Sequence, residues 1–291
     1  MRIVVPFAPG GTSDSLARLL GQKLGEMWGQ TVIVENKAGA DGNLGADHVA
    51  RSAADGYTLM LLDIGTLTMG RVFYAKLPFD PLKDFAPVML IQFSPHVLAV
   101  TPTLPAGNVA EILAYGKANP GKLNFAASNN SARLAGAQLQ QVTGMDMLQI
   151  PYKGAGAAIM AVIAGESNIM FNSVFVTSPH IKSGKVKAIG VASASRSASL
   201  PELPALAEMG VPNFVTGSWQ GLLAPAGTPT DITARINADV GKVPAMPEIR
   251  ARLMEQGADI VGGPGTRLEM LLKTQSQSFL EIARASKIQP Q

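Results

Sequence analysis

The sequence lacks cysteine altogether, and it has only three histidines among its 291 residues. The absence of cysteine excludes disulfides, thiolate catalysis and cysteine-based zinc sites. The histidines, His48, His96 and His180, are far apart and lack the spacing typical of metal ligands. We therefore expect no metal site and no bound cofactor, and catalysis by a histidine general base has little support.

Long hydrophobic runs and clustered charges are missing too. No apolar run approaches the roughly 20 residues that a membrane-spanning helix needs. No basic and apolar leader precedes the first apolar segment, which fits either a mature chain whose leader has been removed or a cytosolic protein. Lysine and arginine are scattered and the net charge is only +3, so we expect no nucleic-acid partner.

Apolar residues, by contrast, are plentiful. They make up 47% of the chain against 15% charged residues, which is typical of a folded protein with a well-buried interior. A chain of 291 residues is longer than one compact core usually organises, so we expect two domains.

The segment 3–14 predicts a strand, a turn and the start of a helix. The apolar residues 3–5 form the strand, and Pro9, Gly10 and Gly11 lie in the turn, where glycine allows close approach of the backbone. A helix N-terminus carries free backbone N–H groups and a partial positive charge, which suit a carboxylate or phosphate. We expect this turn to form half of an anion-binding cleft.

The acidic residue Asp14 has two interpretations. Together with Thr12 and Ser13, it is a candidate to cap the helix that follows the turn, or it is a carboxylate in the first turn that the helix dipole favours. Alternatively, its carboxylate orders waters in the turn or meets an amine or hydroxyl group of the ligand. The sequence leaves both interpretations open.

Strands and helices alternate along the chain, which indicates parallel sheets with right-handed crossovers. Strands predicted at 31–35 and 57–62 also end in loops of glycine and small polar residues, and the second loop contains Gly65 and Thr66. In open sheets of this kind, ligands bind outside the carboxyl ends of the strands. We therefore expect these loops to lie at one edge, together with the turn at the start of the chain.

A later polar loop, Ser128–Ser131, follows a strand predicted at 123–127. It is either a turn with a helix cap or a set of hydrogen-bond donors for a carboxylate, with Ser128, Asn129 and Ser131 as candidates.

Two glycine-containing segments match nucleotide-binding motifs only in part. The segment 116–122 has the spacing of a phosphate-binding loop, but Leu123 stands where Ser or Thr would hold magnesium. We interpret it as a helix end and a turn. The segment 154–156 lacks the third glycine of a dinucleotide fingerprint, because Ile159 takes its place.

Two similar series of strands and helices follow each other, with crossing points predicted near 97–104 and 219–229. Two crossings imply that the C-terminal segment completes the first domain. The predicted division is 1–98 plus 225–291 for the first domain and 99–224 for the second.

Taken together, these landmarks resemble the Bug-type solute-binding proteins, the extracytoplasmic receptors of tripartite tricarboxylate transporters. The resemblance covers nearly the whole chain in order. The longest matching stretches are VVPFAPGGTSD (4–14), VIVENKAGADGNLGA (32–46), YAKLPFDPLKDFAPV (74–88), IPYKGAGAA (150–158), SPHIKSGKVKAIGVASASR (178–196) and GLLAPAGTP (221–229).

The resemblance implies an α/β fold of the periplasmic-binding-protein type II, with two α/β domains joined by two crossover segments and a ligand cleft between them. It implies a periplasmic location and two kinds of partner, a small carboxylate ligand and the membrane permease subunits of a transporter. Family ligands include amino acids, di- and tricarboxylates and aromatic acids.

Family members hold the carboxylate largely through loop backbone groups and bridging waters. Carried over residue by residue, this implies ligand contacts in four loops. These contacts are Phe7, Pro9, Gly10, Gly11 and Asp14; Gly65 and Thr66; Ser128 and Ser131; and, after Phe171, Asn172 and Ser173.

Two loops depart from the family pattern, both in the second domain. The segment 127–137 is about two residues shorter than usual, with Arg133 in place of the family's histidine and Ala137 in place of its glutamate. The segment 172–175 replaces the common Asp-Asn-x-Pro. Arg133 is either an exposed helix residue or an added charge at the cleft, so the identity of the carboxylate stays open.

We therefore expect a receptor without catalytic turnover, which captures a small carboxylate by domain closure and delivers it to a tripartite tricarboxylate-type transporter. A sensory receptor for a carboxylate would have the same binding site. An enzyme acting on an anionic metabolite is the third interpretation, with Asp14 as its acid–base candidate.

Overall fold

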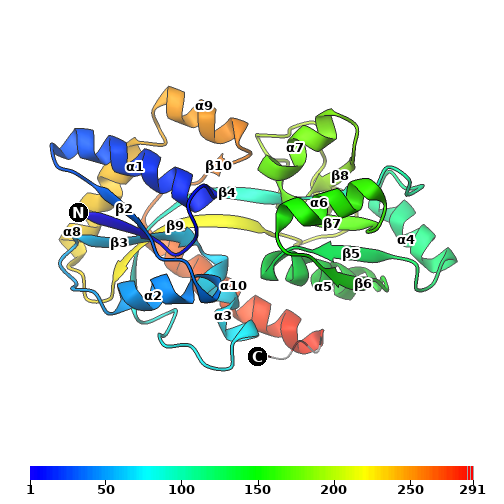
Figure 1. The fold of residues 1–291 in the computed structure, drawn as a ribbon, viewed down its shortest axis with the longest axis horizontal. Helices are drawn as coiled ribbons and strands as arrows, with labels where there is room; N and C mark the ends of the chain where they lie inside the picture. Colours follow the sequence, from blue (N-terminus) through cyan, green and yellow to red (C-terminus); the bar gives the residue numbers. More distant parts are fainter. Residues whose placement is uncertain (287, 289, 291) are drawn as a thin grey trace.

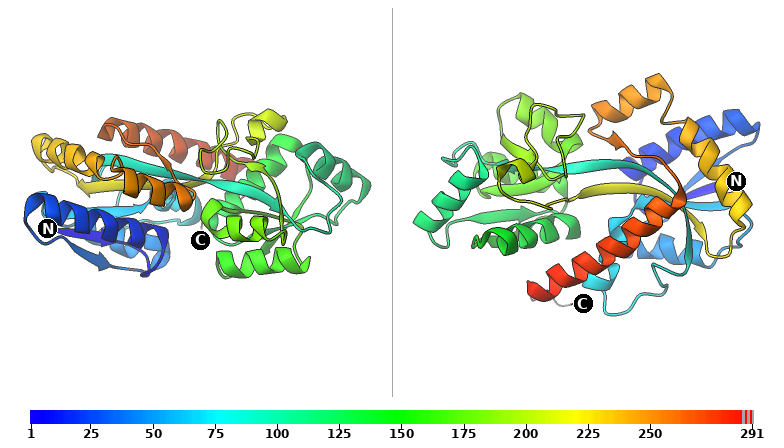
Figure 2. Two further views of the ribbon diagram at one scale, coloured as in Figure 1. Left: turned by 90° about the horizontal axis from the view of Figure 1, so that it is seen from above. Right: turned by 180° about the vertical axis from the view of Figure 1, so that it is seen from behind.

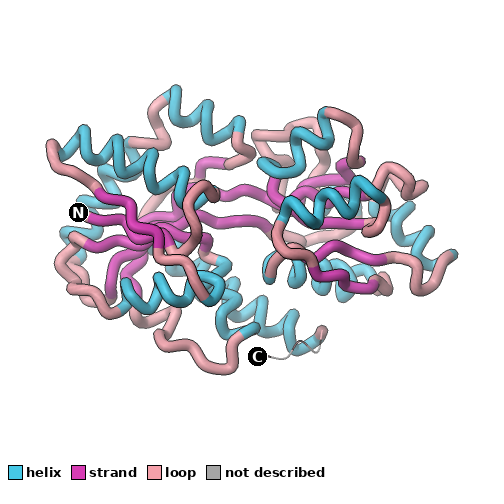
Figure 3. Tube along the Cα trace, viewed as in Figure 1, coloured by secondary structure: helices cyan, strands magenta, loops and turns pink. Residues whose placement is uncertain are grey.

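The structure, a computed structural model that describes residues 1–286, 288 and 290, has two lobes side by side (Figure 1). Within these residues, ten strands form one continuous sheet in the order β2-β1-β3-β9-β4-β7-β5-β6, with β8 and β10 paired to β4. Helices flank the strands in each lobe (Figure 3). This architecture confirms the α/β fold class that the sequence predicts.

The first lobe combines both ends of the chain. Its strands are β1 (Arg2–Val5), β2 (Ile33–Asn36), β3 (Thr58–Asp63), the first part of β4 (Phe85–Val100), β9 (Gly217–Pro225) and β10 (Asp259–Ile260). Its helices are α1 (Thr12–Trp28), η1 (Ala40–Gly42), α2 (Asn43–Ala50), α3 (Gly65–Phe73), α8 (Thr230–Lys242), α9 (Pro247–Glu255) and α10 (Gly265–Ala285). β1 pairs in parallel with β2 and β3, whereas β9 lies antiparallel between β3 and β4.

The second lobe is one continuous stretch of chain. Its strands are the end of β4, β5 (Asn124–Ala127), β6 (Leu148–Pro151), β7 (Ile169–Ser173) and β8 (Lys187–Val191). Its helices are α4 (Val109–Ala118), α5 (Asn130–Thr143), α6 (Ala155–Ala164), α7 (Val174–Lys182) and η2 (Leu206–Met209). β5 is parallel to both β6 and β7.

In the first lobe, the central strands β1, β3 and β9 are largely buried on both faces, as their apolar residues predict. In β1, Ile3 and Val5 pack into the cluster that contains α1, whereas Val4 packs into the cluster on the opposite face, with α2 and α3. This alternation follows from the pleat of the strand. Helix α1 contributes Leu16 and Leu20, which lie four residues apart on one face.

Two segments cross between the lobes, and both lie earlier in the chain than predicted. β4 is one strand rather than two: its residues 85–95 pair with β9, and its residues 96–100 pair with β7 and β8. The second crossing comes at Thr216, just before β9 begins. Figure 2 shows the long strands β4 (cyan) and β9 (yellow) running side by side between the lobes. The domain division stays a prediction, but the pairing places β9 in the first lobe rather than before a boundary at 224.

Two helices occupy segments that the sequence pattern left as loops. Helix α3 contains two glycines and two threonines, residues of modest helix propensity, but it packs against α10 through the buried Leu67 and other apolar side chains. Helix α7 continues through Pro179, a residue that usually interrupts helices. His180, which follows this proline, therefore lies in a helix rather than in a loop between elements.

The lobes also touch through an apolar cluster between α3, α5 and α10. Met69, Phe73 and Phe279 of the first lobe pack there with Leu134 and Ala137 of the second.

None of the helices in the described part of the chain combines the length and apolar character needed to cross a bilayer.

Candidate functional site

A cavity of about 320 Å³ lies between the two lobes, at the carboxyl ends of β1, β3 and β5. Loops of the first lobe and helix α3 form one wall, and the loop after β5 forms the other. The lining residues are Phe7, Asp41, Asn43, Asp63, Gly65, Thr66, Met69, Gly70, Tyr74, Ser128, Asn129, Asn130 and Ser131. The volume is within the range of small-molecule sites.

Three helices begin at this cavity. α2 starts at Asn43, α3 at Gly65 and α5 at Asn130, and all three residues belong to the lining. Among the described residues, no group accepts a hydrogen bond from the backbone N–H of Thr66, Asn130 or Ser131. Each helix start also carries about half a positive charge. The cavity therefore presents free donors and positive potential from both lobes.

The second-lobe wall is held by its own cap. Asn129 has extended backbone angles, and its Oδ1 accepts a hydrogen bond of 2.8 Å from the N–H of Ala132. Asn129 is therefore the N-cap of α5, which fixes the first turn of that helix. The cap interpretation of this loop is confirmed, and the cap residue and its neighbours line the cavity; hydrogen bonds from them to a carboxylate stay a prediction.

A contact between the lobes spans the cleft at Asp41. Its Oδ2 accepts hydrogen bonds from the Tyr74 hydroxyl at 2.7 Å and from Asn130 Nδ2 at 3.4 Å. Burial of the Tyr74 ring, together with this carboxylate, raises the pKa of Tyr74 to about 12. Asp41 belongs to the first lobe and Asn130 to the second, so this hydrogen bond helps to set their separation.

A second carboxylate, Asp63, lies where β3 ends and α3 begins. Its Oδ1 accepts a hydrogen bond of 2.9 Å from the N–H of Gly65, and its side chain also bonds to Ser218 and to the backbone of Trp219. Burial raises the pKa of Asp63, and these hydrogen bonds oppose the rise. In the described residues, no group of three or more metal-ligating side chains gathers here or elsewhere.

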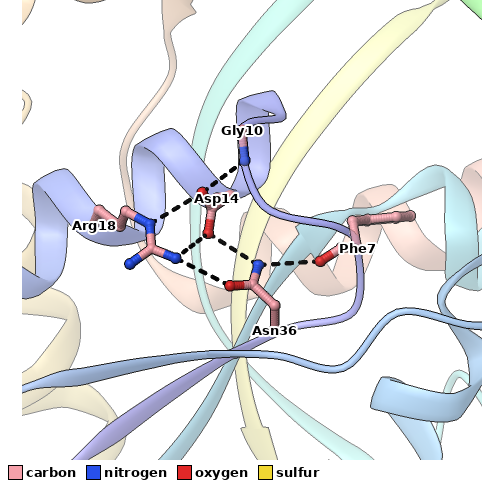
Figure 4. A network of polar contacts seen from close by, with 5 residues as sticks. All are labelled: Phe7, Gly10, Asp14, Arg18 and Asn36. Carbon is pink, nitrogen blue, oxygen red and sulfur yellow. Dashed lines mark hydrogen bonds and ion pairs between the residues drawn. The ribbon is translucent and has the colours of Figure 1, made fainter.

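Asp14 organises the turn before α1 (Figure 4). Its Oδ2 accepts hydrogen bonds from the N–H of Gly10 at 2.9 Å and from Arg18 Nε at 3.0 Å, and its Oδ1 accepts one from Asn36 Nδ2 at 2.9 Å. Arg18 first, and then Gly10 and Asn36, lower the pKa of Asp14 to about 2 against the effect of burial.

The expectation of a side-chain cap from residue 12, 13 or 14 is wrong, whereas the interpretation of Asp14 as a carboxylate in the first turn of the helix is confirmed. Gly11 occupies the N-cap position without a side-chain cap, because Asp14 reaches back to Gly10 instead. Both oxygens of Asp14 are engaged within the first lobe, and Asp14 is not among the described residues that line the cavity. These contacts support a structural role for Asp14.

The structure brings half of the predicted site residues together in the cavity. These are Phe7, Gly65, Thr66, Ser128, Asn129 and Ser131. The predicted residues outside its lining are Pro9, Gly10, Gly11, Asp14, Asn172 and Ser173. In the second lobe, Asn172 accepts a hydrogen bond from the N–H of Ser173, and Ser173 is the N-cap of α7. Ligand contact by all twelve stays a prediction.

Sequence reasoning missed several lining residues, among them Asp41, Asn43 and Asp63. A signal for them was present, because Asp63 directly follows one predicted strand, and Asp41 and Asn43 lie near the end of the loop that follows another. Their side chains were passed over because no motif singles them out. Tyr74 and Met69 gave no such signal, since α3 was not predicted.

Arg133 is not the exposed helix residue of its first interpretation, and an added charge at the cleft stays a prediction. It is partly buried rather than exposed, and its guanidinium carbon lies 5.1 Å from the centre of the Phe73 ring. Its Nε is buried and finds no acceptor among the described residues. Arg133 thus joins α5 to α3 beside the cavity, as a cation–π contact between the lobes.

Two α/β lobes, two crossing segments and a cavity where helix N-termini of both lobes meet define a solute-binding protein. The chain belongs to the tripartite tricarboxylate transporter receptor family. The family model described as "Tripartite tricarboxylate transporter family receptor" matches residues 16–286. The resemblance that the sequence motifs predict is thereby confirmed.

Solved structures agree with this assignment. Rpa4515 of R. palustris, determined with adipate, is 31% identical over 100% of this chain and 98% of its own, with a TM-score of 0.86. The periplasmic binding protein BugD is 31% identical over 100% and 98%, with a TM-score of 0.81. MatC from Rhodopseudomonas palustris, with bound malate, is 31% identical over 97% and 98%, with a TM-score of 0.81. The family and these neighbours are binding proteins rather than enzymes.

Proposed function

We propose that this protein is a periplasmic receptor that holds a small carboxylate between its lobes and delivers it to the membrane subunits of a tripartite transporter. Family membership supports the role as a transporter receptor. The adipate and malate in neighbours with similar lobes support a carboxylate as the ligand.

One observation carries the proposal: free backbone donors of opposite lobes face the same cavity. Thr66 offers its N–H from α3, and Asn130 and Ser131 offer theirs from α5. Hydrogen bonds to a charged group contribute about 1.5–3 kcal/mol each. A carboxylate that accepts from both helices therefore stabilises the closed arrangement of the lobes, and capture follows from closure.

The start of α5 allows a direct test of this role. Asn130 is the first helical residue, and Asn129 before it is extended, so proline fits position 130 without disturbing the helix. Asn130→Pro removes the N–H and the side chain, whereas the control Asn130→Ala removes only the side chain and its contact with Asp41.

Isothermal titration with a panel of small acids, with product analysis in parallel, measures the effect. We expect saturable binding without product, and an affinity for the best acid about 10- to 100-fold lower in Asn130→Pro than in Asn130→Ala, since tenfold corresponds to about 1.4 kcal/mol. Equal affinities in the two variants would show that the α5 N-terminus does not hold the carboxylate. Turnover of the acid would contradict the receptor role.

A further inference from the structure

The loop between β2 and α2 has an unusual backbone. Its residues 39–42 all have positive φ angles, of 146°, 47°, 52° and 93° in order. The glycines at 39 and 42 adopt such angles freely, whereas Ala40 and, to a smaller extent, Asp41 do so at a cost in free energy. Elsewhere in the described chain, Asn213 is the one non-glycine residue with a positive φ. Strained backbone of this kind is concentrated at functional sites, where the surrounding structure holds it.

The strained loop holds the carboxylate of Asp41 between the two walls of the cavity. The Tyr74 hydroxyl of the first lobe donates to Asp41 Oδ2 at 2.7 Å, and Asn130 Nδ2 of the second lobe donates to the same oxygen at 3.4 Å. All three residues line the cavity, and Asp41 is exposed, so it lies where the cavity opens to solvent. The carboxylate is therefore a fixed feature of the cavity mouth.

Packing behind Asp41 keeps the loop in place. A Cβ on Gly42 would lie 3.0 Å from the Thr66 methyl group and 3.4 Å from the Phe7 ring, so the backbone of the loop rests against two residues of the lining. The N–H of Gly42 also donates to the carbonyl oxygen of Gly39 at 2.9 Å. Asp41 therefore cannot turn away from the cavity without the loss of these contacts.

The negative charge of Asp41 is only partly compensated. Among the described residues that line the cavity, none is lysine, arginine or histidine. The hydrogen bonds to Asp41 come from two neutral groups and reach Oδ2, and no described group donates to Oδ1. The start of α2, two residues later, supplies only about half a positive charge. A net negative charge therefore remains at the mouth.

This charge lies beside the donors that we assign to the ligand. Asn130 belongs to both groups, because its backbone N–H is one of the free donors and its side chain reaches Asp41. A carboxylate at the starts of α3 and α5 meets free N–H groups. A second carboxylate on the same ligand that points toward the mouth meets the charge of Asp41 and no lining cation among the described residues. Like charges closer than the Debye length of about 8 Å repel each other appreciably.

We propose that Asp41 is a specificity-determining residue, which makes this receptor prefer monocarboxylates to dicarboxylates. This inference rests on the proposed function and narrows its ligand class. Phe7 and Met69 supply apolar lining for the uncharged part of a monocarboxylate.

Acids of equal chain length test this preference by isothermal titration of the whole protein. The pairs are butanoate with succinate, pentanoate with glutarate, and hexanoate with adipate. In the pair that binds most tightly, we expect the monocarboxylate to bind at least about threefold more tightly, since repulsion between unit charges roughly 6 Å apart corresponds to about threefold even in bulk water. A dicarboxylate that binds as tightly as its monocarboxylate, or more tightly, would overturn the preference and leave the carboxylate receptor intact.

Asp41→Asn tests the residue itself. Asparagine keeps the size of the side chain, tolerates a positive φ and still accepts from the Tyr74 hydroxyl, so the charge alone is lost. We expect the dicarboxylate to gain at least about threefold in affinity relative to its monocarboxylate. Asp47→Asn is the matched control, since it removes one charge from α2 outside the cavity, where the described partner of Asp47 is Arg51. An unchanged ratio in Asp41→Asn, or an equal change in Asp47→Asn, would overturn the role of Asp41.

Salt separates an effect of charge from an effect of shape. Asp41 is exposed, so its charge is screened at an ionic strength of about 1 M, where the Debye length is about 3 Å. The preference of the wild type should therefore shrink as sodium chloride rises from about 0.01 M to about 1 M, and the ratio in Asp41→Asn should change less. An equal salt dependence of the two ratios would overturn the electrostatic role.

A second variant keeps the inference testable if Asp41→Asn does not fold. Glycine adopts a φ of 52° without strain, so Asp41→Gly should lose the preference in the same way. Failure of all six acids to bind the wild type would overturn both proposals. If the acids bind without the expected preference, the inference on Asp41 fails alone, because the comparison of Asn130→Pro with Asn130→Ala tests the carboxylate end separately.

Discussion

Removing the charge of Asp14 should destabilise the protein by about 2 kcal/mol at neutral pH. The carboxyl group is 3% exposed, and its pKa falls from 3.8 to about 2 in the fold. Each unit of difference between the folded and unfolded pKa corresponds to about 1.4 kcal/mol. Asp14→Asn keeps the size of the side chain and removes the charge that Arg18 and the N–H of Gly10 stabilise.

The sign of the pH dependence follows from the lowered pKa. Above about pH 5 the carboxylate is ionised in both states, so its full contribution is present. As the pH falls from about 5 towards 2, the unfolded chain takes up the proton first, and the contribution is lost. By pH 3 about half of it should remain.

Urea unfolding at pH 7, 5 and 3, followed by circular dichroism, measures this difference between wild type and variant. Asp47→Asn is a matched control, because Asp47 and Arg51 form an i,i+4 ion pair like that of Asp14 and Arg18, but at the surface. The Asp47 and Arg51 side chains are 27% and 69% exposed. Such pairs contribute below about 1 kcal/mol. The reasoning fails if Asp14→Asn costs no more than Asp47→Asn at pH 7, or if its cost is the same at pH 3.

Three further results are expected. Gly136→Ala should cost about 1–3 kcal/mol in urea unfolding, because its Cβ would come within 2.1 Å of the Phe125 ring, whereas Gly156→Ala, with nothing within 4 Å, should be neutral or stabilising. Burial lowers the pKa of His96 to about 4, so the free energy of unfolding should fall as the pH drops from 6.5 to 4, and it should fall less in His96→Gln. An equal dependence of the free energy of unfolding on pH in the two proteins would refute this. In a spectrophotometric titration of the wild type, one of the four tyrosines should ionise near pH 12, and this ionisation should be absent from Tyr74→Phe.

The sequence is most informative where local pattern and tertiary packing agree. The strand at the start of the chain, the helix after it and the polar loop before α5 all follow from apolar periodicity and turn chemistry, and the structure has them. The same agreement extends to the family, because the motifs that carry the resemblance are runs of neighbouring residues, and most of them lie within the residues 16–286 that the family model matches. These features depend on neighbours in the chain.

Features that depend on distant contacts were not predictable in the same way. Helix α3 has a poor helical sequence and is held by packing against α10, about 200 residues later. β4 contains Pro95, a residue that suggests the end of a strand. In the structure, Pro95 is still paired with Gly217 of β9, and the register of the two strands does not shift at that residue. The position of Asp63 in the cavity lining depends on where α3 begins, so missing that helix also hid this lining residue.

Helix α5 connects the proposed carboxylate site to the contact between the lobes. Its first residue, Asn130, offers a free N–H to the cavity, and Leu134 and Ala137 follow on the same face at helical spacing. Those two side chains pack with Phe73 and Phe279 of the first lobe. The apolar contact therefore already holds the second lobe near the first, and a ligand at the start of α5 adds to an existing attachment. Binding energy is then needed only to tighten the closed arrangement, which favours capture by groups as weak as backbone amides.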